Sequence, residues 1–185
     1  MATQFDHISD AHRAFIEAQH IFFVATAAPD GRVNVSPKGM DSLRLLGPNR
    51  IVWLNLTGSG NETAAHLARA NRMTLMWAGF QARPMIIRAY GSARLHHPGE
   101  AGWDALPKAL TGQLGARQVF DMQVDILQTS CGYGVPFFDY RGERDVLKNW
   151  AEDRGEDGLR RYWHERNARS IDGFATDFTA GDDDT

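Results

Sequence analysis

A short loop between an apolar run and a helix-forming run carries the residue types that could bind an anion. The loop, 57–61, holds two glycines among three short polar residues. The segment 62–70 is rich in helix formers, and Ser59 and Glu62 have the spacing of a capping box. A helix start leaves backbone N–H groups free at the positive end of the helix dipole. The loop therefore predicts a phosphate cradle, with an ordinary capped helix as the alternative.

The apolar run before this loop, 51–56, is interrupted by one polar residue, Asn55. A continuous apolar run of this length is typical of a buried strand. An amide buried in such a strand needs a hydrogen-bond partner. We expect that partner to be either a ligand or the protein backbone.

A second group of polar residues lies where an earlier strand is expected to end. The segment 33–36 alternates apolar and polar residues, and Pro37 follows it. Proline lacks an N–H donor, so it is expected to interrupt the strand at a sheet edge or a bulge. Ser36, Lys38 and Gly39 are therefore predicted beside an irregular backbone, where ligands often bind.

The remaining pattern predicts a mainly β protein with flanking helices, arranged as an antiparallel barrel or sandwich. Strands are expected at 21–27, 33–36, 43–46, 51–56, 72–77, 84–95 and 117–129, and helices at 10–19, 62–70, 98–110, 144–151 and 158–167. Gly91 is expected to mark a bulge or a close approach in its strand. In the strand 117–129, the residues Phe120, Met122, Val124 and Ile126 alternate with polar ones, which predicts a sheet with one wet face.

The segment 130–136 holds two glycines, a tyrosine and a proline, and predicts an irregular loop. Tyr133 in this loop is a candidate to close over a ligand, and the alternative is a constrained loop at a dimer contact. Cys131 has no histidine or aspartate near it in sequence to activate it, so a packed structural thiol is expected.

Length and composition favour one soluble globular domain. The chain has 185 residues, 43% of them hydrophobic, and a formal net charge of -3, which gives no reason to expect nucleic acid as a partner. The single cysteine excludes an internal disulfide and fits a reducing, cytoplasmic location. We expect one domain over 1–181, with a helical extension from about 143 and an acidic tail at 182–185. No apolar run is long enough to predict a membrane span, and no histidine or cysteine spacing predicts a metal site.

The ordered set of these segments resembles the pyridoxamine 5′-phosphate oxidase-like flavoproteins, in a branch that is not the true oxidase. The residues that carry the resemblance are Asp30-Gly31, Val33-Asn34-Val35-Ser36-Pro37-Lys38-Gly39, Trp53-Leu54-Asn55-Leu56, Ser59-Gly60-Asn61-Glu62-Thr63 and Arg72-Met73-Thr74-Leu75-Met76-Trp77. The resemblance implies the FMN-binding split β-barrel fold and a homodimer with a cofactor site at each subunit interface.

For individual residues, the resemblance implies that the strand bearing Ser36 and Lys38 lies along a flavin, with Gly39 beside it. It also implies that Ser59, Asn61 and Thr63 surround the flavin phosphate. Asn55 and Tyr133 are further candidates for cofactor contact. We assign no catalytic acid or base.

Two departures from the family pattern bear on the substrate. In the true oxidase a Ser-Arg-Lys step supplies two cations to the phosphate, whereas this chain has Gly60-Asn61-Glu62-Thr63 there. The true oxidase also ends with an Arg-x-His segment that binds the substrate phosphate, and this sequence shows nothing like it, so pyridoxamine 5′-phosphate is not the expected substrate. The sequence predicts an FMN-dependent oxidoreductase acting on an unidentified small molecule. The alternatives are a non-catalytic flavin- or haem-binding protein and a deazaflavin-dependent reductase.

Overall fold

The computed structural model describes residues 2–178, so the predicted acidic tail at 182–185 lies outside the described residues. The strands are β1 (Thr3–Phe5), β2 (Phe22–Thr26), β3 (Asn34–Lys38), β4 (Leu43–Gly47), β5 (Arg50–Leu56), β6 (Met73–Ala78), β7 (Met85–His96) and β8 (Ala116–Cys131). The helices are α1 (Asp10–Glu17), α2 (Glu62–Arg69), α3 (Ala101–Asp104), α4 (Lys108–Thr111) and α5 (Val146–Arg166).

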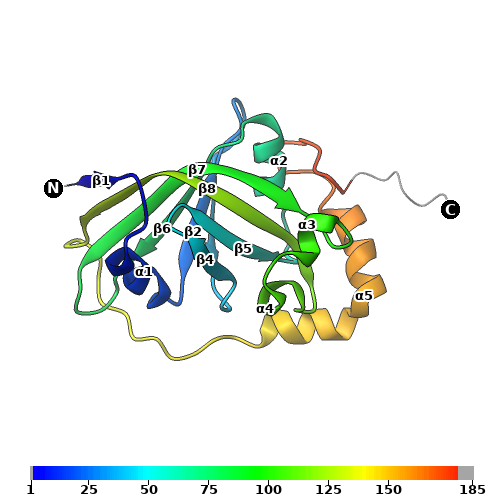
Figure 1. The fold of residues 1–185 in the computed structure, drawn as a ribbon. Helices are drawn as coiled ribbons and strands as arrows, with labels where there is room; N and C mark the ends of the chain where they lie inside the picture. Colours follow the sequence, from blue (N-terminus) through cyan, green and yellow to red (C-terminus); the bar gives the residue numbers. More distant parts are fainter. Residues whose placement is uncertain (1, 179–185) are drawn as a thin grey trace.

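The strands form one antiparallel sheet in the order β3-β2-β6-β7-β8-β5-β4, and β1 pairs with β8 (Figure 1). The sheet curls around its core, with α1 at one end and α3 and α4 beside the ends of β5 and β8 (Figure 1). The predicted mainly β architecture with flanking helices is confirmed. The three-residue strand β1 was not predicted, because so short a segment has no visible alternation.

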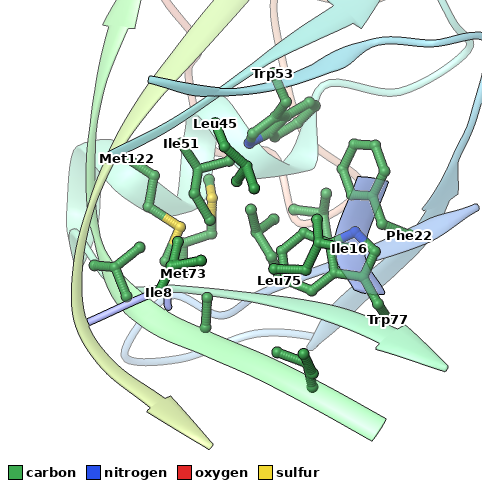
Figure 2. Packing of buried hydrophobic residues seen from close by; sticks show 14 of the residues in the cluster. Ile8, Ile16, Phe22, Leu45, Ile51, Trp53, Met73, Leu75, Trp77 and Met122 are labelled. Atoms are coloured by element: carbon green, nitrogen blue, oxygen red, sulfur yellow. The ribbon is translucent and has the colours of Figure 1, made fainter. Parts of the chain in front are cut away.

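The main core lies inside the curled sheet and is built around aromatic rings. Trp53 of β5 stacks on Phe120 of β8 with ring centroids 4.5 Å apart, and Phe22 of β2 packs edge-on against Trp53. Figure 2 shows Phe22 and Trp77 beside Ile16 of α1, so this helix closes one end of the core. Burying rings and aliphatic side chains in this way supplies most of the stabilisation of the fold.

Pro37 lies at a sheet edge, which was one of the two predicted positions, but it does not interrupt its strand. β3 continues through Pro37, which stands opposite Phe23, and ends at Lys38. Since β3 is the edge strand of the sheet, the missing N–H of Pro37 costs no ladder hydrogen bond. The regular alternation of β3 places the side chains of Asn34, Ser36 and Lys38 on the same face of the strand.

The bulge predicted at Gly91 is confirmed, and it reverses which side chains of β8 point toward the core. The register between β7 and β8 shifts between Tyr90 and Gly91, where a Cβ on Gly91 would lie 1.9 Å from the carbonyl oxygen of Gln123. Beyond this shift the alternation reverses, so that Leu127 is buried and Ile126 is 42% exposed. The expectation that Ile126 shares the buried face of Phe120 and Val124 is therefore wrong.

The C-terminal helical extension consists of two pieces joined at Gly155, which has a positive φ of 63°. The two helical segments predicted from the sequence correspond to these pieces. The second piece packs against the loop after β5, where the Trp163 indole N–H donates to Thr57 Oγ1 over 2.8 Å. In the part of the chain that the structure describes, no helix is long and apolar enough to cross a membrane.

Candidate functional site

A cavity of about 530 Å³ lies between the edge strand β3, the loop after β5 and the start of α2. Six of the eight predicted site residues line it: Ser36, Lys38, Asn55, Ser59, Asn61 and Thr63. Segments separated in the sequence by the whole of β4 and β5 meet here. We call this space the site cavity.

The polar face of β3 forms one wall of the site cavity. Asn34, Ser36 and Lys38 alternate with Val35 and Pro37, so all three side chains point to the same side. The Asn34 amide donates to Thr63 Oγ1 over 3.4 Å, which links this wall to the first turn of α2.

Lys38 and Asn55 meet at the bottom of the site cavity. The Lys38 ammonium donates to Asn55 Oδ1 over 3.3 Å, and the Asn55 amide in turn donates to Gln118 Oε1 over 3.2 Å. Asn55 is 4% exposed and is hydrogen-bonded, as its burial requires, but its partners are two side chains and not the backbone that was expected as one alternative. Burial, and to a smaller extent the charge of Arg117, lower the pKa of Lys38 to about 8.

Arg117 is a cation of this site that the sequence reasoning did not select. It stands at the start of β8, is 2% exposed, and lines the site cavity. Its Nη1 donates to Asn167 Oδ1 over 2.7 Å, whereas its Nε–H has no partner. Burial lowers the pKa of Arg117 to about 10, which leaves the guanidinium charged at neutral pH.

The start of α2 differs from the predicted capping box. The helix begins at Glu62 after Asn61, and no side chain caps it. The Glu62 carboxylate instead accepts the backbone N–H of Ile171 over 3.1 Å, so Ser59 and Glu62 do not form the reciprocal pair. Because no side chain caps this end, the helix start keeps donors available to a ligand in the cavity.

Several buried polar atoms of the site cavity have no hydrogen-bond partner in the described residues. They are Asn61 Oδ1, His66 Nε2 and Arg117 Nε, and the Gln118 amide behind Asn55 has a free Nε2. The other ring nitrogen of His66, Nδ1, lies 3.1 Å from Thr26 Oγ1. Buried polar groups are normally paired, and these atoms, which are almost fully shielded from solvent, lie behind the surface of the cavity.

The segment after α5 returns to the site cavity and holds its walls together (Figure 1). Asn167, fully buried, donates to the carbonyl of Gly58 over 3.0 Å and accepts the bond from Arg117. Asp172 accepts the backbone N–H of Arg32 over 2.8 Å and forms an ion pair with the Arg32 side chain. We call residues 167–173 the C-terminal clasp.

Gly39, the seventh predicted residue, lines a different and larger cavity of about 1380 Å³. This apolar cavity lies between α1, the loop 79–83 and the segment 138–150, and Lys38 lines it as well. Its outer wall is held by the Phe138 N–H, which donates to the Phe80 carbonyl over 3.1 Å. Lys38 is therefore the side chain at which the two cavities adjoin.

Tyr133, the eighth predicted residue, lies at the far end of β8 and lines neither cavity of its own chain. Its side chain is 83% exposed, because the strand ends at Cys131 and the chain turns away at Gly132. Cys131 itself is exposed, so the expected packed thiol is wrong. Within residues 2–178, no three His, Cys, Asp or Glu side chains are arranged to hold a metal ion.

Comparisons with known proteins agree with this architecture. The family model described as pyridoxamine 5′-phosphate oxidase matches residues 8–130. The pyridoxamine 5′-phosphate oxidase family protein ustO of Aspergillus flavus is 34% identical over 191 residues, covering 92% of this chain and 76% of the relative.

Two solved structures share the fold at low sequence identity. HupZ from Group A Streptococcus has a TM-score of 0.53 at 21% identity, covering 64% of this chain and 91% of that one. A putative pyridoxamine 5′-phosphate oxidase from Lactobacillus delbrueckii has a TM-score of 0.53 at 18% identity, covering 66% and 94%. On these matches, the chain belongs to the pyridoxamine 5′-phosphate oxidase family and has its split-barrel fold.

Proposed function

We propose that this protein is an FMN-dependent oxidoreductase that acts on a small molecule, with FMN bound in the site cavity of a homodimer. One observation carries the proposal. A buried cation, Arg117, and a half-buried one, Lys38, share a cavity with the uncapped start of α2. Such a cavity is suited to an anion, and a flavin mononucleotide ends in a phosphate.

The residues around the cavity fit that phosphate. The free N–H groups at the start of α2, the hydroxyl of Thr63 and the guanidinium of Arg117 are donors that line one space. Asn61, with a free Oδ1 and an amide that reaches only the Asn167 carbonyl at 3.4 Å, lies beside them. These groups would replace the two cations that the Ser-Arg-Lys step supplies in the true oxidase.

The flavin ring would lie along β3, where Ser36 and Lys38 present polar groups. A bound flavin supplies hydride or single-electron transfer, which no protein side chain provides. The ammonium of Lys38 would place a positive charge beside the ring, which favours the reduced, anionic form. Asn55 fixes the position of that ammonium through its 3.3 Å hydrogen bond.

The apolar cavity beside Lys38 is the proposed entry for the substrate. It adjoins the site cavity at this residue, so a molecule within it could approach a ring that lies along β3. Its walls include Phe23 and Trp150, which favour an apolar or aromatic substrate over a sugar or a nucleotide. Gly39 at this border leaves room for close approach to the backbone.

The homodimer is proposed because the outer face of the sheet exposes apolar side chains. Val33, just before β3, and Val35 within it are 71% and 62% exposed, and Ile126 on β8 is also exposed. A row of paired residues crosses the five neighbouring strands β3, β2, β6, β7 and β8. In this order its members are Val35, Ala25, Thr74, Tyr90 and Ile126. Apolar patches of this kind usually mark a protein interface.

The test is to incubate the purified protein with FMN, remove free flavin and record the visible spectrum. Retained flavin absorbance, followed by sustained oxidation of a nicotinamide cofactor in the presence of an electron acceptor, is the expected result. Retained flavin without turnover would indicate a binding protein on the same fold. If the protein retains a deazaflavin or haem but no FMN, the proposed cofactor is wrong.

A further inference from the structure

The segment 136–144, which leads from β8 to α5, forms part of the wall of the apolar cavity. It contains no helix or strand, and all of its residues are exposed. Figure 1 shows it running along the lower edge of the molecule, from the end of β8 to the start of α5. Phe138, Tyr140 and Glu143 within it line the apolar cavity. We call residues 136–144 the strap.

The backbone of the strap is only lightly fastened to the rest of the protein. Among the described residues, it makes one hydrogen bond to another backbone group, from the Phe138 N–H to the Phe80 carbonyl over 3.1 Å. The rings of the same two residues meet edge to face, with centroids 5.4 Å apart. Segments with an exposed backbone and few buried contacts open at the lowest free energy. The strap is therefore a part of the chain that can detach while the sheet stays folded.

Tyr140 makes the main side-chain contact between the strap and the body of the protein. Its ring stacks on the His20 imidazole, with centroids 3.6 Å apart and planes 9° from parallel. Its hydroxyl donates to Glu143 Oε1 over 3.1 Å, and Glu143 Oε2 accepts the Met40 N–H over 3.3 Å. His20 follows α1 and Met40 follows β3, and both residues line the apolar cavity. Tyr140 therefore ties the strap to two separate elements that border this cavity.

We propose that the strap is a lid that opens to admit the substrate to the apolar cavity and closes over it, with the stack of Tyr140 on His20 as its latch. This inference rests on the proposed function, which places the substrate in that cavity. The cavity borders Lys38, beside which the flavin ring would lie, so a closed lid would keep water away from the reacting groups. A single exposed pair of stacked rings is weak enough to open repeatedly and strong enough to favour the closed form.

Limited digestion with trypsin tests the latch without any ligand. Arg141 and Arg144 lie in the strap, and a protease needs a detached, extended segment, so cleavage there follows the population of the open lid. Tyr140→Ala and His20→Ala remove the stack and should speed this cleavage roughly threefold to tenfold. Phe137→Ala is the matched control, because Phe137 is a strap residue that is 81% exposed and lines neither cavity.

Tyr140→Phe separates the two contacts of the latch residue. It keeps the stack and loses the hydrogen bond to Glu143, so cleavage should stay within about twofold of the unmodified rate. Equal cleavage rates for Tyr140→Ala and Phe137→Ala would overturn the latch. Mass spectrometry identifies the cut sites, and faster cleavage that extends to arginines of the sheet would overturn it too, because the stack would then support the whole fold.

The binding rates of an apolar fluorescent probe test the gating of the cavity. Anilinonaphthalene sulfonate is mixed with the ligand-free protein, and stopped-flow fluorescence gives its association and dissociation rates. A latch slows entry and exit alike, so Tyr140→Ala should raise both rate constants roughly threefold to tenfold, with a smaller change in the dissociation constant. A rise in the dissociation rate alone would mean that Tyr140 only contacts the probe. That result, unchanged rates, or a protein that binds no probe would overturn the lid.

Neither assay contains FMN, so this inference and the proposed function can fail separately. If no flavin binds while the latch variants behave as expected, the flavin proposal fails and the lid stands. If flavin binds and turns over while all variants share the same cleavage and probe rates, the lid is wrong and the proposed function stands.

Discussion

Lys38 has an unusual electrostatic position for a lysine at a strand end. Its side chain lines both the site cavity and the apolar cavity, and its ammonium has one neutral hydrogen-bond partner, Asn55. Burial and the charge of Arg117 lower its pKa to about 8, so a part of the ligand-free protein carries a neutral Lys38 above neutral pH. Binding of an anion must favour the charged form.

The pH dependence of FMN binding follows from this pKa. The affinity for FMN should be nearly constant between roughly pH 6.5 and 7.5. In this range the phosphate, with a pKa of about 6, is mostly a dianion, and Lys38 is mostly charged. Above pH 8 the free protein must take up a proton to bind FMN, so the affinity should fall by up to about tenfold per pH unit.

Lys38→Met should bind FMN roughly 10- to 100-fold more weakly and lose this pH dependence. Fluorescence titrations across this pH range are the measurement, and an unchanged pH profile in Lys38→Met would remove Lys38 from the site.

Sequence reasoning found some residues of the site and missed others for identifiable reasons. Asn55 stands out because it is the one polar residue in an apolar strand. Arg117 opens an alternating strand, where an arginine is usually exposed. It is buried only because Asn167, fifty residues later, folds back onto the start of β8. No local pattern contains that contact.

At the scale of elements, the C-terminal clasp joins the two walls of the site cavity. Asp172 binds Arg32 in the turn before β3, and the Ile171 N–H binds Glu62 at the start of α2. The backbone N–H of Arg32 is the main cause that lowers the pKa of Asp172. Ile171 itself lines the cavity, so the clasp forms part of its rim.

Loosening the clasp should speed the release of the cofactor. Asp172→Ala removes the contact with Arg32 and should raise the dissociation rate of FMN roughly threefold to tenfold, with a smaller effect on the association rate. Stopped-flow fluorescence after dilution measures the rate. Asp153→Ala, an exposed aspartate on α5, is the control. Equal dissociation rates for the two variants would show that the clasp does not limit release.

The elements themselves were largely predictable because their cues are local. Ser9, a residue type that favours helix starts, caps α1 with its hydroxyl accepting the His12 N–H, and the bulge at Gly91 follows from the absence of a Cβ. The reversal that exposes Ile126 was not predictable from β8 alone, because the register shift arises in its pairing with β7. The edge position expected for Pro37 is confirmed, but the strand is not interrupted there, since an edge strand can lack an N–H donor on its outer side.

At the scale of the whole molecule, the outer face of the sheet is unusually apolar for a solvated surface. The row that runs from Val35 to Ile126 crosses five strands, and its two end residues are exposed. A second copy that covers this row would bury these side chains and bring another chain close to the edge strand β3. The role of Tyr133 as a cofactor contact stays a prediction for such a dimer.

A charge placed on this face should separate the subunits. Val35→Glu should convert the protein from a dimer to a monomer and weaken FMN binding, because the proposed site is completed at the interface. Light scattering after gel filtration gives the mass of each form. Leu46→Glu, on the opposite edge strand β4, should leave the mass unchanged. A monomeric unmodified protein, or a Val35→Glu variant that stays dimeric, would place the interface elsewhere.

The central claim is that the site cavity holds the phosphate of FMN between Arg117, Lys38 and the start of α2. Phosphorus NMR of FMN bound to the protein tests it most directly. The account predicts one displaced resonance whose shift no longer titrates near the free phosphate pKa of about 6, because the two cations hold the dianion. A bound flavin whose phosphorus resonance titrates as it does in free FMN would contradict the account.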